Sequence, residues 1–168
     1  MCAPIEPARA CARGFSLIEV LVTLAVSALA LLGAAILTLH AMKFNQSGRY
    51  RTQAVVLSGD IAERIEANKD AAKLGSYVLN GAAAASLKDC SVNGCTAGEL
   101  ATYDLAQWAA AVNLLLPGGS STIAQSVTGN PTTYQIVVSW VDRSDGVPAG
   151  GSPQTETFSY TTSKTVYH

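Results

Sequence analysis

The sequence predicts an α+β fold, in which one long N-terminal helix spans a membrane in its first half and packs in its second half on a small antiparallel sheet. Three observations lead to this prediction. No charged residue occurs from Val20 to Leu39, and a helix of that length crosses the ~30 Å hydrocarbon core of a bilayer. Apolar residues then recur at helical spacing as far as Ala72. The last third of the chain alternates apolar and polar residues, as strands do.

The length and charge of the chain limit what it can be. Its 168 residues suffice for one globular domain beside a membrane segment. We expect residues 15–42 to form the transmembrane and assembly half of the helix, residues 43–74 its amphipathic half, and residues 75–168 the globular head. The formal net charge is −1, so the composition offers no strongly basic surface, and no nucleic-acid partner is predicted.

One acidic residue stands at the start of the apolar stretch. Glu19 follows Phe15 and three further uncharged residues, and the uncharged run from Val20 begins directly after it. A carboxylate at the centre of a membrane segment costs ~2.5–3.5 kcal/mol, and less near the interface. An acid in this position therefore indicates a functional partner, unless it lies in the headgroup layer and does nothing.

Two general explanations of the N-terminus can be weighed first. A secretory signal peptide would use Arg9 and Arg13 as its charged region and residues 28–30 as its cleavage site. The apolar run continues past Ala30, however, and Glu19 would lie in a core that should be uncharged. A plain single-pass anchor fits the length. Its orientation is not decided by charge, because basic residues flank both ends of the span, with Lys43, Arg49 and Arg51 after it.

A third explanation rests on the residues around Gly14. Residues 13–22 read Arg-Gly-Phe-Ser-Leu-Ile-Glu-Val-Leu-Val. This run resembles the class III signal of type IV prepilins, in which a glycine precedes an aromatic residue and a glutamate stands at the fifth mature position. The resemblance implies that an inner-membrane prepilin peptidase cuts between Gly14 and Phe15, that residues 1–14 are a cleaved leader, and that the same enzyme N-methylates Phe15. The mature chain would keep 168 − 14 = 154 residues.

Such a cleavage would give Glu19 a chemical partner. It exposes the α-amine of Phe15, whose ordinary pKa is ~7.7–8.0, at the edge of an apolar helix. In a continuous helix Glu19 lies about 6 Å further along the axis. Pairing the amine with the carboxylate offsets part of the desolvation cost of both groups. The spacing fits the amine of the same chain as well as that of a neighbour, and the resemblance implies pairing between subunits.

The second half of the helix carries an apolar stripe along one side. No proline occurs from Phe15 to Lys73, so a single helix is expected over this range, with Gly75 as its C-terminal cap. Most charged residues lie off the stripe, which predicts that one face packs on the sheet. The stripe comprises Ala54, Leu57, Ile61, Ile65, Asn68 and Ala72.

The head contains a pair of cysteines, Cys90 and Cys95, with the turn-forming Asn93-Gly94 between them. A head outside the cytosol lies in an oxidising compartment, so we predict a disulfide between the two. No metal site is predicted, because the chain has two histidines, at the membrane end of the helix and at the last position.

The rest of the head predicts a helix and several strands. Thr96-Ala-Gly-Glu99 offers a capping box, and Asp104 to Gln107 offers a second start, so a helix is expected to reach from there to Leu116 and to stop at Pro117-Gly-Gly. Its buried side is expected to hold Leu100, Trp108, Val112 and either Leu115 or Leu116. Strands are expected at 77–79, 122–128, 133–141 and 155–162. Their inner faces are expected to carry Tyr134, Ile136, Val138, Trp140, Phe158 and Tyr160.

The order of motifs in the head is similar to that of PilV-type minor pilins. The cysteine pair is followed by Tyr-Asp-Leu-Ala-Gln-Trp at 103–108, Leu-Pro-Gly-Gly at 116–119 and Tyr-Gln-Ile-Val-Val-Ser-Trp at 134–140. The resemblance implies a pilin-like fold and a minor type IV pilin that primes or joins the pilus. The implied partners are other minor and major pilins, the prepilin peptidase and methyltransferase, the inner-membrane assembly platform and the membrane. The implied location is the inner membrane, with a single pass and the head in the periplasm, and then the pilus or cell surface.

Two alternatives to this function stay open. A minor pseudopilin of a type II secretion system would share the same processing chemistry. A membrane-tethered periplasmic binding domain or enzyme would never assemble. No catalytic residues and no cofactor are predicted, because the sequence has no nucleophile elbow, phosphate-binding loop or zinc-ligand spacing. We therefore expect that the chain is not an enzyme.

Overall fold

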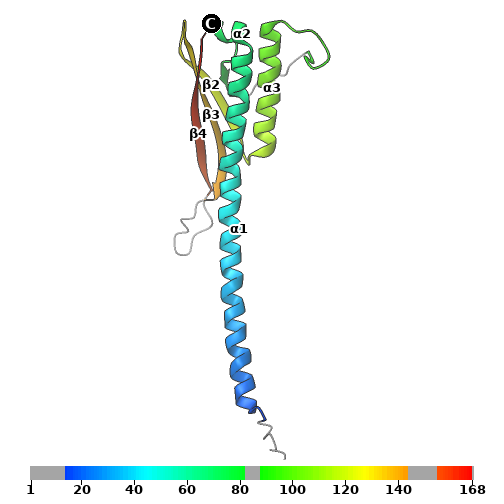
Figure 1. Cartoon of the computed structure of the whole chain (residues 1–168), viewed down its shortest axis with the longest axis vertical. Coiled ribbons are helices and arrows are strands. Elements are labelled where there is room, and N and C mark those ends of the chain that lie inside the picture. Colours follow the sequence, from blue (N-terminus) through cyan, green and yellow to red (C-terminus); the bar gives the residue numbers. More distant parts are fainter. Residues whose placement is uncertain (1–13, 82–87, 144–154, 168) are drawn as a thin grey trace, which may run out of the picture. The chain divides into compact units, whose positions relative to one another are not determined.

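The computed structural model describes residues 14–81, 88–143 and 155–167. The chain divides into two compact units, Met1–Phe44 and Asn45–His168, which are described in turn. An apolar helix is followed by a four-stranded antiparallel sheet, which confirms the predicted α+β class (Figure 1). The elements are α1 (Leu17–Ala67), α2 (Lys69–Lys73), β1 (Leu79–Asn80), α3 (Ala97–Leu115), β2 (Ser120–Val127), β3 (Thr132–Arg143) and β4 (Thr155–Val166).

The first unit holds the apolar part of α1. This helix is long and apolar enough to cross a membrane, and none of its most apolar window is buried within the chain. Its hydroxyl groups donate to carbonyl oxygens one turn earlier: Thr23 to Val20 at 2.9 Å, Ser27 to Thr23 at 2.7 Å and Thr38 to Ala35 at 2.8 Å. These polar groups are therefore satisfied inside the helix, as a hydrocarbon environment requires.

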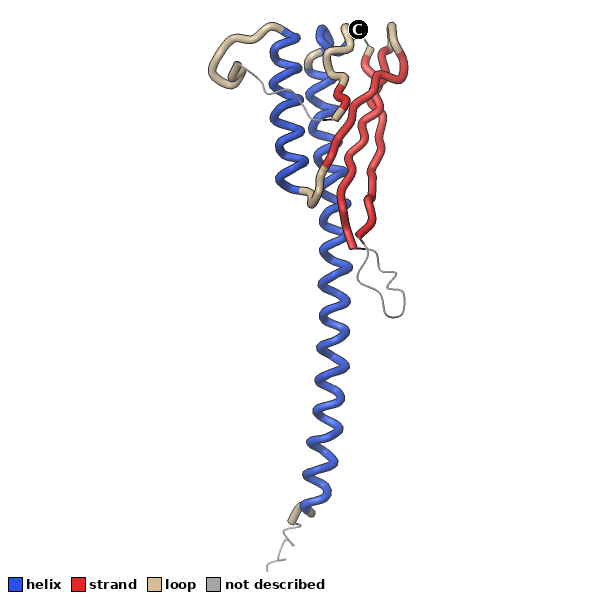
Figure 2. Tube along the Cα trace, turned by 180° about the vertical axis from the view of Figure 1, so that it is seen from behind, coloured by secondary structure: helices blue, strands red, loops and turns tan. Residues whose placement is uncertain are grey.

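In the second unit, the remaining part of α1 and the shorter helix α3 cover one face of the sheet (Figure 2). The strand order is β1-β2-β3-β4, and each neighbouring pair is antiparallel. β3 and β4 pair over their whole length, from Thr132 opposite Val166 to Arg143 opposite Thr155, with no irregularity in the register. β4 is four residues longer than predicted at its C-terminal end.

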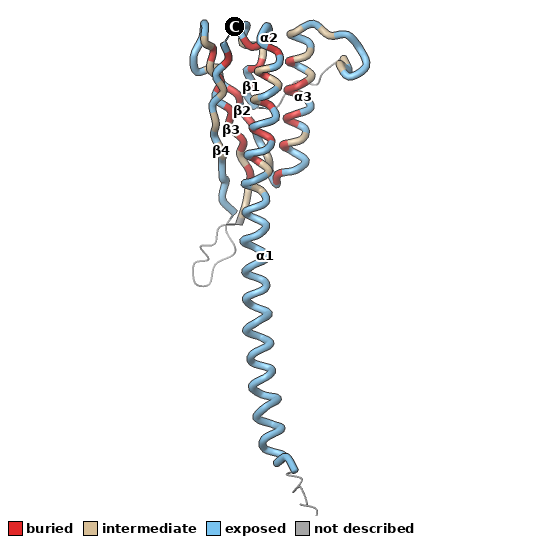
Figure 3. Tube along the Cα trace, in the orientation of Figure 1, coloured by how far each residue is buried: buried red, intermediate tan, exposed pale blue. Residues whose placement is uncertain are grey.

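The core lies between this sheet and the helices (Figure 3). Trp108 of α3 donates its indole N–H to the carbonyl of Leu57 at 2.8 Å, and the Tyr134 hydroxyl of β3 donates to the carbonyl of Ala72. Trp108 thus links α3 to α1, and Tyr134 links β3 to α2. Each of these buried aromatic residues also satisfies a backbone carbonyl group. The predicted inward residues of α1, α2 and β3 are buried, namely Ala54, Leu57, Ile61, Ile65, Ala72, Tyr134, Ile136, Val138 and Trp140.

The long helix is interrupted at Asn68, so the expectation of one helix as far as Lys73 is wrong. Asn68 has φ −113° and ψ 61°, between the end of α1 and the start of α2. Its buried side-chain amide donates to the carbonyl of Ala97 at 2.8 Å and to the hydroxyl of Tyr77 at 3.2 Å. These tertiary hydrogen bonds satisfy a buried amide that would otherwise be costly. Gly75, at φ 76°, follows the end of α2 as predicted.

Helix α3 begins with a predicted capping box, and Trp108, Val112 and Leu116 of its expected buried side are buried. Leu100 is only half-buried, and Leu115 is exposed whereas Leu116 is buried. The prediction did not include Asp104, a carboxylate on the core side of the helix that has polar partners there. The buried face consists of Ala101, Asp104, Leu105, Trp108, Ala109 and Val112.

Two strand predictions also need correction. The first strand is Leu79–Asn80 rather than 77–79. Phe158 lies on the expected inner face, opposite buried Trp140, but it is 39% exposed. It lies on the edge strand, where its ring stacks on Trp140 with a centroid distance of 6.2 Å. An edge position leaves one side of a side chain without a neighbouring strand, which explains its exposure. The predicted connection beyond Arg143 lies outside the described residues.

A buried polar cluster joins the helices of the head. Asp104 accepts a hydrogen bond from the Tyr77 hydroxyl at 2.7 Å and pairs with the Arg64 guanidinium at 3.1 Å. Burial and the hydrogen bond to Asp104 raise the pKa of Tyr77 well above its ordinary value. For Arg64, burial alone would lower the pKa, but contacts with Asp104 and Asp60 outweigh it and raise the pKa. The cluster therefore keeps its tyrosine neutral and its arginine charged.

Replacing Asp104 with alanine is expected to lower the free energy of unfolding by about 2–3 kcal/mol, because Tyr77 and Arg64 lose their charged acceptor in a buried place. Urea unfolding of the detergent-solubilised chain would measure this. The control is Asp60→Ala, which removes a 45% exposed carboxylate bonded to the same guanidinium at 3.0 Å and should cost at most about 0.5 kcal/mol. Equal losses in the two variants would contradict a special role of the buried acid.

Candidate functional site

The segment that precedes α1 is exposed. Phe15 is 81% exposed, and a β-carbon added at Gly14 would meet no other atom within 4 Å. Nothing in the packing of the described chain therefore requires glycine at this position. Exposed peptide bonds outside regular structure are the usual sites of proteolysis. The Gly14–Phe15 bond has the accessibility that an enzyme needs.

Helix α1 begins at Leu17, two residues later than the expected start at Phe15. The carbonyl of Ser16 accepts hydrogen bonds from the backbone N–H groups of Glu19 at 3.0 Å and Val20 at 3.3 Å. Phe15 therefore lies just outside the helix in the uncleaved chain. The rise of about 6 Å between Phe15 and Glu19 holds only where the helix extends back to Phe15.

Glu19 occupies the first turn of α1 and is exposed. Its carboxylate has no hydrogen-bond or ion-pair partner among the residues that the structure describes. A structural explanation exists, because an acid near a helix N-terminus gains ~0.3–1 kcal/mol from the helix dipole. That gain is smaller than the ~2.5–3.5 kcal/mol cost of a carboxylate deep in a membrane. If Glu19 enters hydrocarbon, the dipole alone does not account for it.

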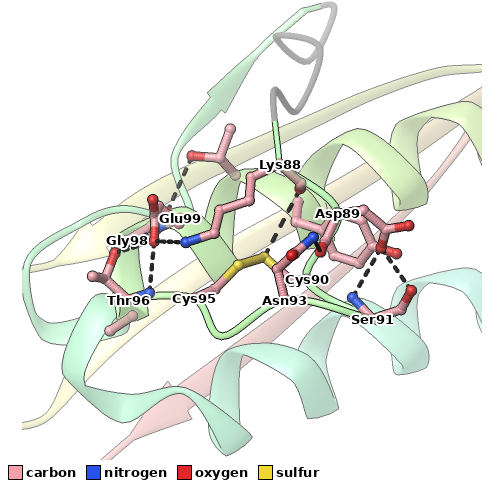
Figure 4. The surroundings of a disulfide bond; sticks show 12 residues. Lys88, Asp89, Cys90, Ser91, Asn93, Cys95, Thr96, Gly98 and Glu99 are labelled. Carbon is pink, nitrogen blue, oxygen red and sulfur yellow. Dashed lines mark hydrogen bonds and ion pairs between the residues drawn. A yellow bond between two sulfur atoms is a disulfide. The ribbon is translucent and has the colours of Figure 1, made fainter.

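The predicted disulfide between Cys90 and Cys95 is present, with the two Cα atoms 5.7 Å apart (Figure 4). It closes a short loop directly before α3. The Glu99 carboxylate accepts from the Thr96 backbone N–H at 2.8 Å and pairs with the Lys88 ammonium at 3.1 Å. These contacts lower the pKa of Glu99. The loop is thus fastened to the start of α3 at several points, and the disulfide serves as a clamp.

The predicted site residues form two separate sets. Gly14, Phe15 and Glu19 lie within six positions of the first unit, and the two cysteines lie in the second. Over the described ranges, no three histidine, cysteine, aspartate or glutamate side chains gather as metal ligands would. Sequence reasoning missed the partners of Asp104. The available signal was Asp104 itself, a polar residue at a position of the helix where the spacing predicts an apolar one.

One cleft of about 300 Å³ lies in the second unit. Its described lining contains no histidine, cysteine or serine. The lining residues are Gln46, Tyr50, Pro117, Val141, Asp142 and Thr155.

Comparison with known proteins gave two family matches. Residues 9–35 match the prokaryotic N-terminal methylation motif, which includes Gly14, Phe15 and Glu19. Residues 36–106 match the family described as type IV pilin Tt1218. No curated protein and no solved structure gave a significant match. The two matches adjoin along the chain and together support a type IV pilin.

Proposed function

We propose that this chain, which the family matches support as a type IV pilin, is a minor pilin that is cut after Gly14, N-methylated at Phe15 and incorporated through α1. One observation carries the proposal. The exposed Gly14–Phe15 bond, at a glycine with no packing role, stands directly before an apolar helix whose first turn holds Glu19. A methylation motif covers these same residues.

The proposed processing involves three groups of this chain: the Gly14–Phe15 bond, the amine of Phe15 and the carboxylate of Glu19. Hydrolysis of the Gly14–Phe15 bond consumes one water, and leaves a carboxylate on Gly14 and an amine on Phe15. The methyltransferase would then move a methyl group from an electrophilic methyl donor to that amine; the N–C bond forms as the donor's bond to the methyl group breaks, and the amine loses one proton. The amine keeps its basicity, and as a cation at an apolar helix end it needs an anion. Glu19 is the nearest acid along the chain, since the next one after it is Asp60.

Assembly follows from the apolar part of α1. An exposed apolar helix of this length is stable in a bilayer or against other apolar helices, and not in water. We propose that it anchors the precursor in the inner membrane and later packs among the helices of other pilin subunits. The assigned partners are other minor and major pilins, the prepilin peptidase and methyltransferase, and the inner-membrane assembly platform.

The disulfide supports a periplasmic head. Cys90 and Cys95 are bonded, and structural disulfides persist in oxidising compartments such as the periplasm. The position of this pair supports a minor subunit rather than the main fibre subunit, because it precedes α3 and no cysteine occurs after Cys95 to close a C-terminal loop. A pseudopilin would be processed in the same way.

The N-terminal mass of the membrane-extracted protein tests this function. We expect a chain that begins at N-methyl-Phe15 in cells with the prepilin peptidase, and the full precursor in cells that lack it. A chain that begins at Leu31 would indicate a signal peptide, and an intact Met1 in both strains would indicate a plain anchor. Either result would overturn the proposal. Recovery of the mature chain from sheared pili would separate a pilin from a pseudopilin.

A further inference from the structure

Strand β4 forms an edge of the sheet that is open to pairing. Within the described part of the chain, β3 is its only neighbouring strand. Natural edge strands are usually protected by charges, prolines or bulges. β4 has no bulge against β3, no proline, and two charged residues, Glu156 and Lys164. The Lys164 ammonium lies 3.2 Å from Glu66 on α1 and so points toward the helix. Between them, residues 157–163 carry no charge.

The sequence of β4 is self-complementary when it is reversed about Tyr160. In an antiparallel pair centred there, Glu156 lies opposite the partner's Lys164, and Lys164 lies opposite the partner's Glu156. The hydroxyl residues also meet one another, with Thr155 opposite the partner's Thr165 and Ser159 opposite the partner's Thr161. We propose that β4 pairs antiparallel with β4 of a second copy of this chain, in the register centred on Tyr160.

The side chains of such a pair would match those already on the outer face of the sheet. Thr155, Thr157 and Ser159 would add hydroxyl pairs to the outer face, where Thr133 and Thr165 already make a cross-strand hydroxyl contact at 3.0 Å. Cross-strand pairs of Thr and Ser, of aromatic residues and of opposite charges all stabilise antiparallel strands. Every position from 155 to 165 gains a partner of one of these kinds, except Phe158 and Thr162, which lie opposite each other.

The charges at the two ends of β4 fit such a partner. The β3–β4 register places Glu156 directly opposite Asp142, so two acids share one place on the sheet. Like charges in directly opposed positions disfavour pairing. The partner's Lys164 would bring a cation to these acids, while Lys164 keeps Glu66 and gains the partner's Glu156. The second copy would thus bring a cation beside Glu156.

The direction of β4 decides how the two copies are presented. Thr155 lines the same cleft as Gln46 and Tyr50 of α1, and Lys164 reaches Glu66 near the end of that helix. β4 therefore runs alongside the second part of α1 in the same direction. Antiparallel pairing of β4 sets the two α1 segments antiparallel, so the chains preceding Asn45 attach at opposite ends of the joined sheet. This geometry suits copies anchored in two opposed membranes or filaments, and for that anchoring it rests on the proposed function.

A single pair of edge strands buries little surface, which is typical of a weak contact. Many copies on two facing surfaces raise the effective concentration and convert weak pairs into firm adhesion.

Charge reversal tests the register. Sedimentation of the full chain in detergent should show a reversible dimer, and Glu156→Lys should weaken it at least about tenfold, since it places lysine opposite lysine twice per dimer. Within the chain, the new lysine at position 156 would lie opposite Asp142, an opposite charge, so the substitution should not impair folding. The control Glu63→Lys makes the same charge change at an exposed position of α1 and should leave the dimer unchanged.

The decisive result is a mixture. Glu156→Lys and Lys164→Glu should each fail to dimerise alone, and should form a mixed dimer together, because both ion pairs are then restored. If Lys164→Glu lowers the melting temperature, the double variant Lys164→Glu with Glu66→Lys is used in the mixture in its place. The double variant keeps an ion pair between position 164 and the helix. A monomeric wild-type chain, or no rescue in the mixture, would overturn the pairing.

Pairing between copies anchored in two opposed membranes, here called the trans arrangement, is tested with vesicles of neutral phospholipid that carry the full chain. Light scattering should show vesicle aggregation with the wild type, none with Glu156→Lys, and recovery when Glu156→Lys vesicles meet Lys164→Glu vesicles. Dimers without aggregation would overturn the trans geometry. These tests use the uncleaved chain, so a failure of leader processing would leave their outcome unchanged and would be seen separately by mass.

Discussion

Gly14→Leu is expected to leave the full-length precursor in the membrane. The structure gives this prediction its force, because a β-carbon at Gly14 meets nothing within 4 Å and Gly14 has no positive φ. The substitution should therefore leave folding and membrane insertion intact. A side chain beside the cleaved bond would instead clash in the peptidase, where a misplacement of ~1 Å can cost on the order of 10²-fold in rate. The measurement is the mass of the membrane-extracted chain in cells with the peptidase.

Gly33→Leu is the matched control for this experiment. Gly33 is also a glycine whose added β-carbon would meet nothing, but it lies well inside α1 and far from the cleaved bond. Its variant should be processed at the normal rate. An unchanged mature mass in Gly14→Leu would show that glycine is not recognised there and would sink the processing hypothesis. Retention of the precursor in both variants would indicate a general defect of insertion.

Glu19→Ala should preserve cleavage and insertion, and reduce incorporation into pili on the order of 10²-fold or more. Removing one member of an ion pair in a low-dielectric bundle costs about 3–5 kcal/mol, since the Phe15 ammonium stays behind unpaired. Glu19 has no side-chain partner in the described chain, so its loss should not disturb the single subunit. The readout is the amount of variant in sheared pili relative to the membrane fraction.

Two further variants make the Glu19 result specific. Glu19→Gln keeps the shape and removes the charge, so it should fail nearly as severely as alanine if an ion pair is the cause. Glu63→Ala removes an exposed acid from the same helix and should incorporate normally. Normal incorporation of Glu19→Ala would show that the carboxylate is incidental.

Periodic burial explains which parts of the fold could be predicted. Ile61 and Ile65 repeat at helical spacing, and Tyr134, Ile136 and Val138 repeat at strand spacing, so a single buried face follows from the pattern. All of these residues are buried. The capping box at Thr96 and the closure of the Cys90–Cys95 loop are local as well, because their partners lie within six positions of each other.

The errors occurred where a polar side chain finds a partner far along the chain. Asn68 ends α1, where its amide reaches Ala97, and Asp104 is buried in α3 where its carboxylate reaches Arg64, forty positions earlier. The spacing of neighbouring residues does not reveal contacts between residues so far apart in the sequence. The exposure of Phe158 has a similar cause, since its position on an edge strand depends on the order of the whole sheet.

The sequence by itself determined the α+β class, the membrane-length helix, the motif around Gly14 and the pairing of Cys90 with Cys95, because each depends on residue spacing or on a short run of residues. Only the tertiary structure decided where α1 ends, which partners the buried Asp104 of α3 has, and that β4 is an edge strand of the sheet. These features depend on contacts between residues distant in sequence, and such contacts form only when the sheet and helices pack together.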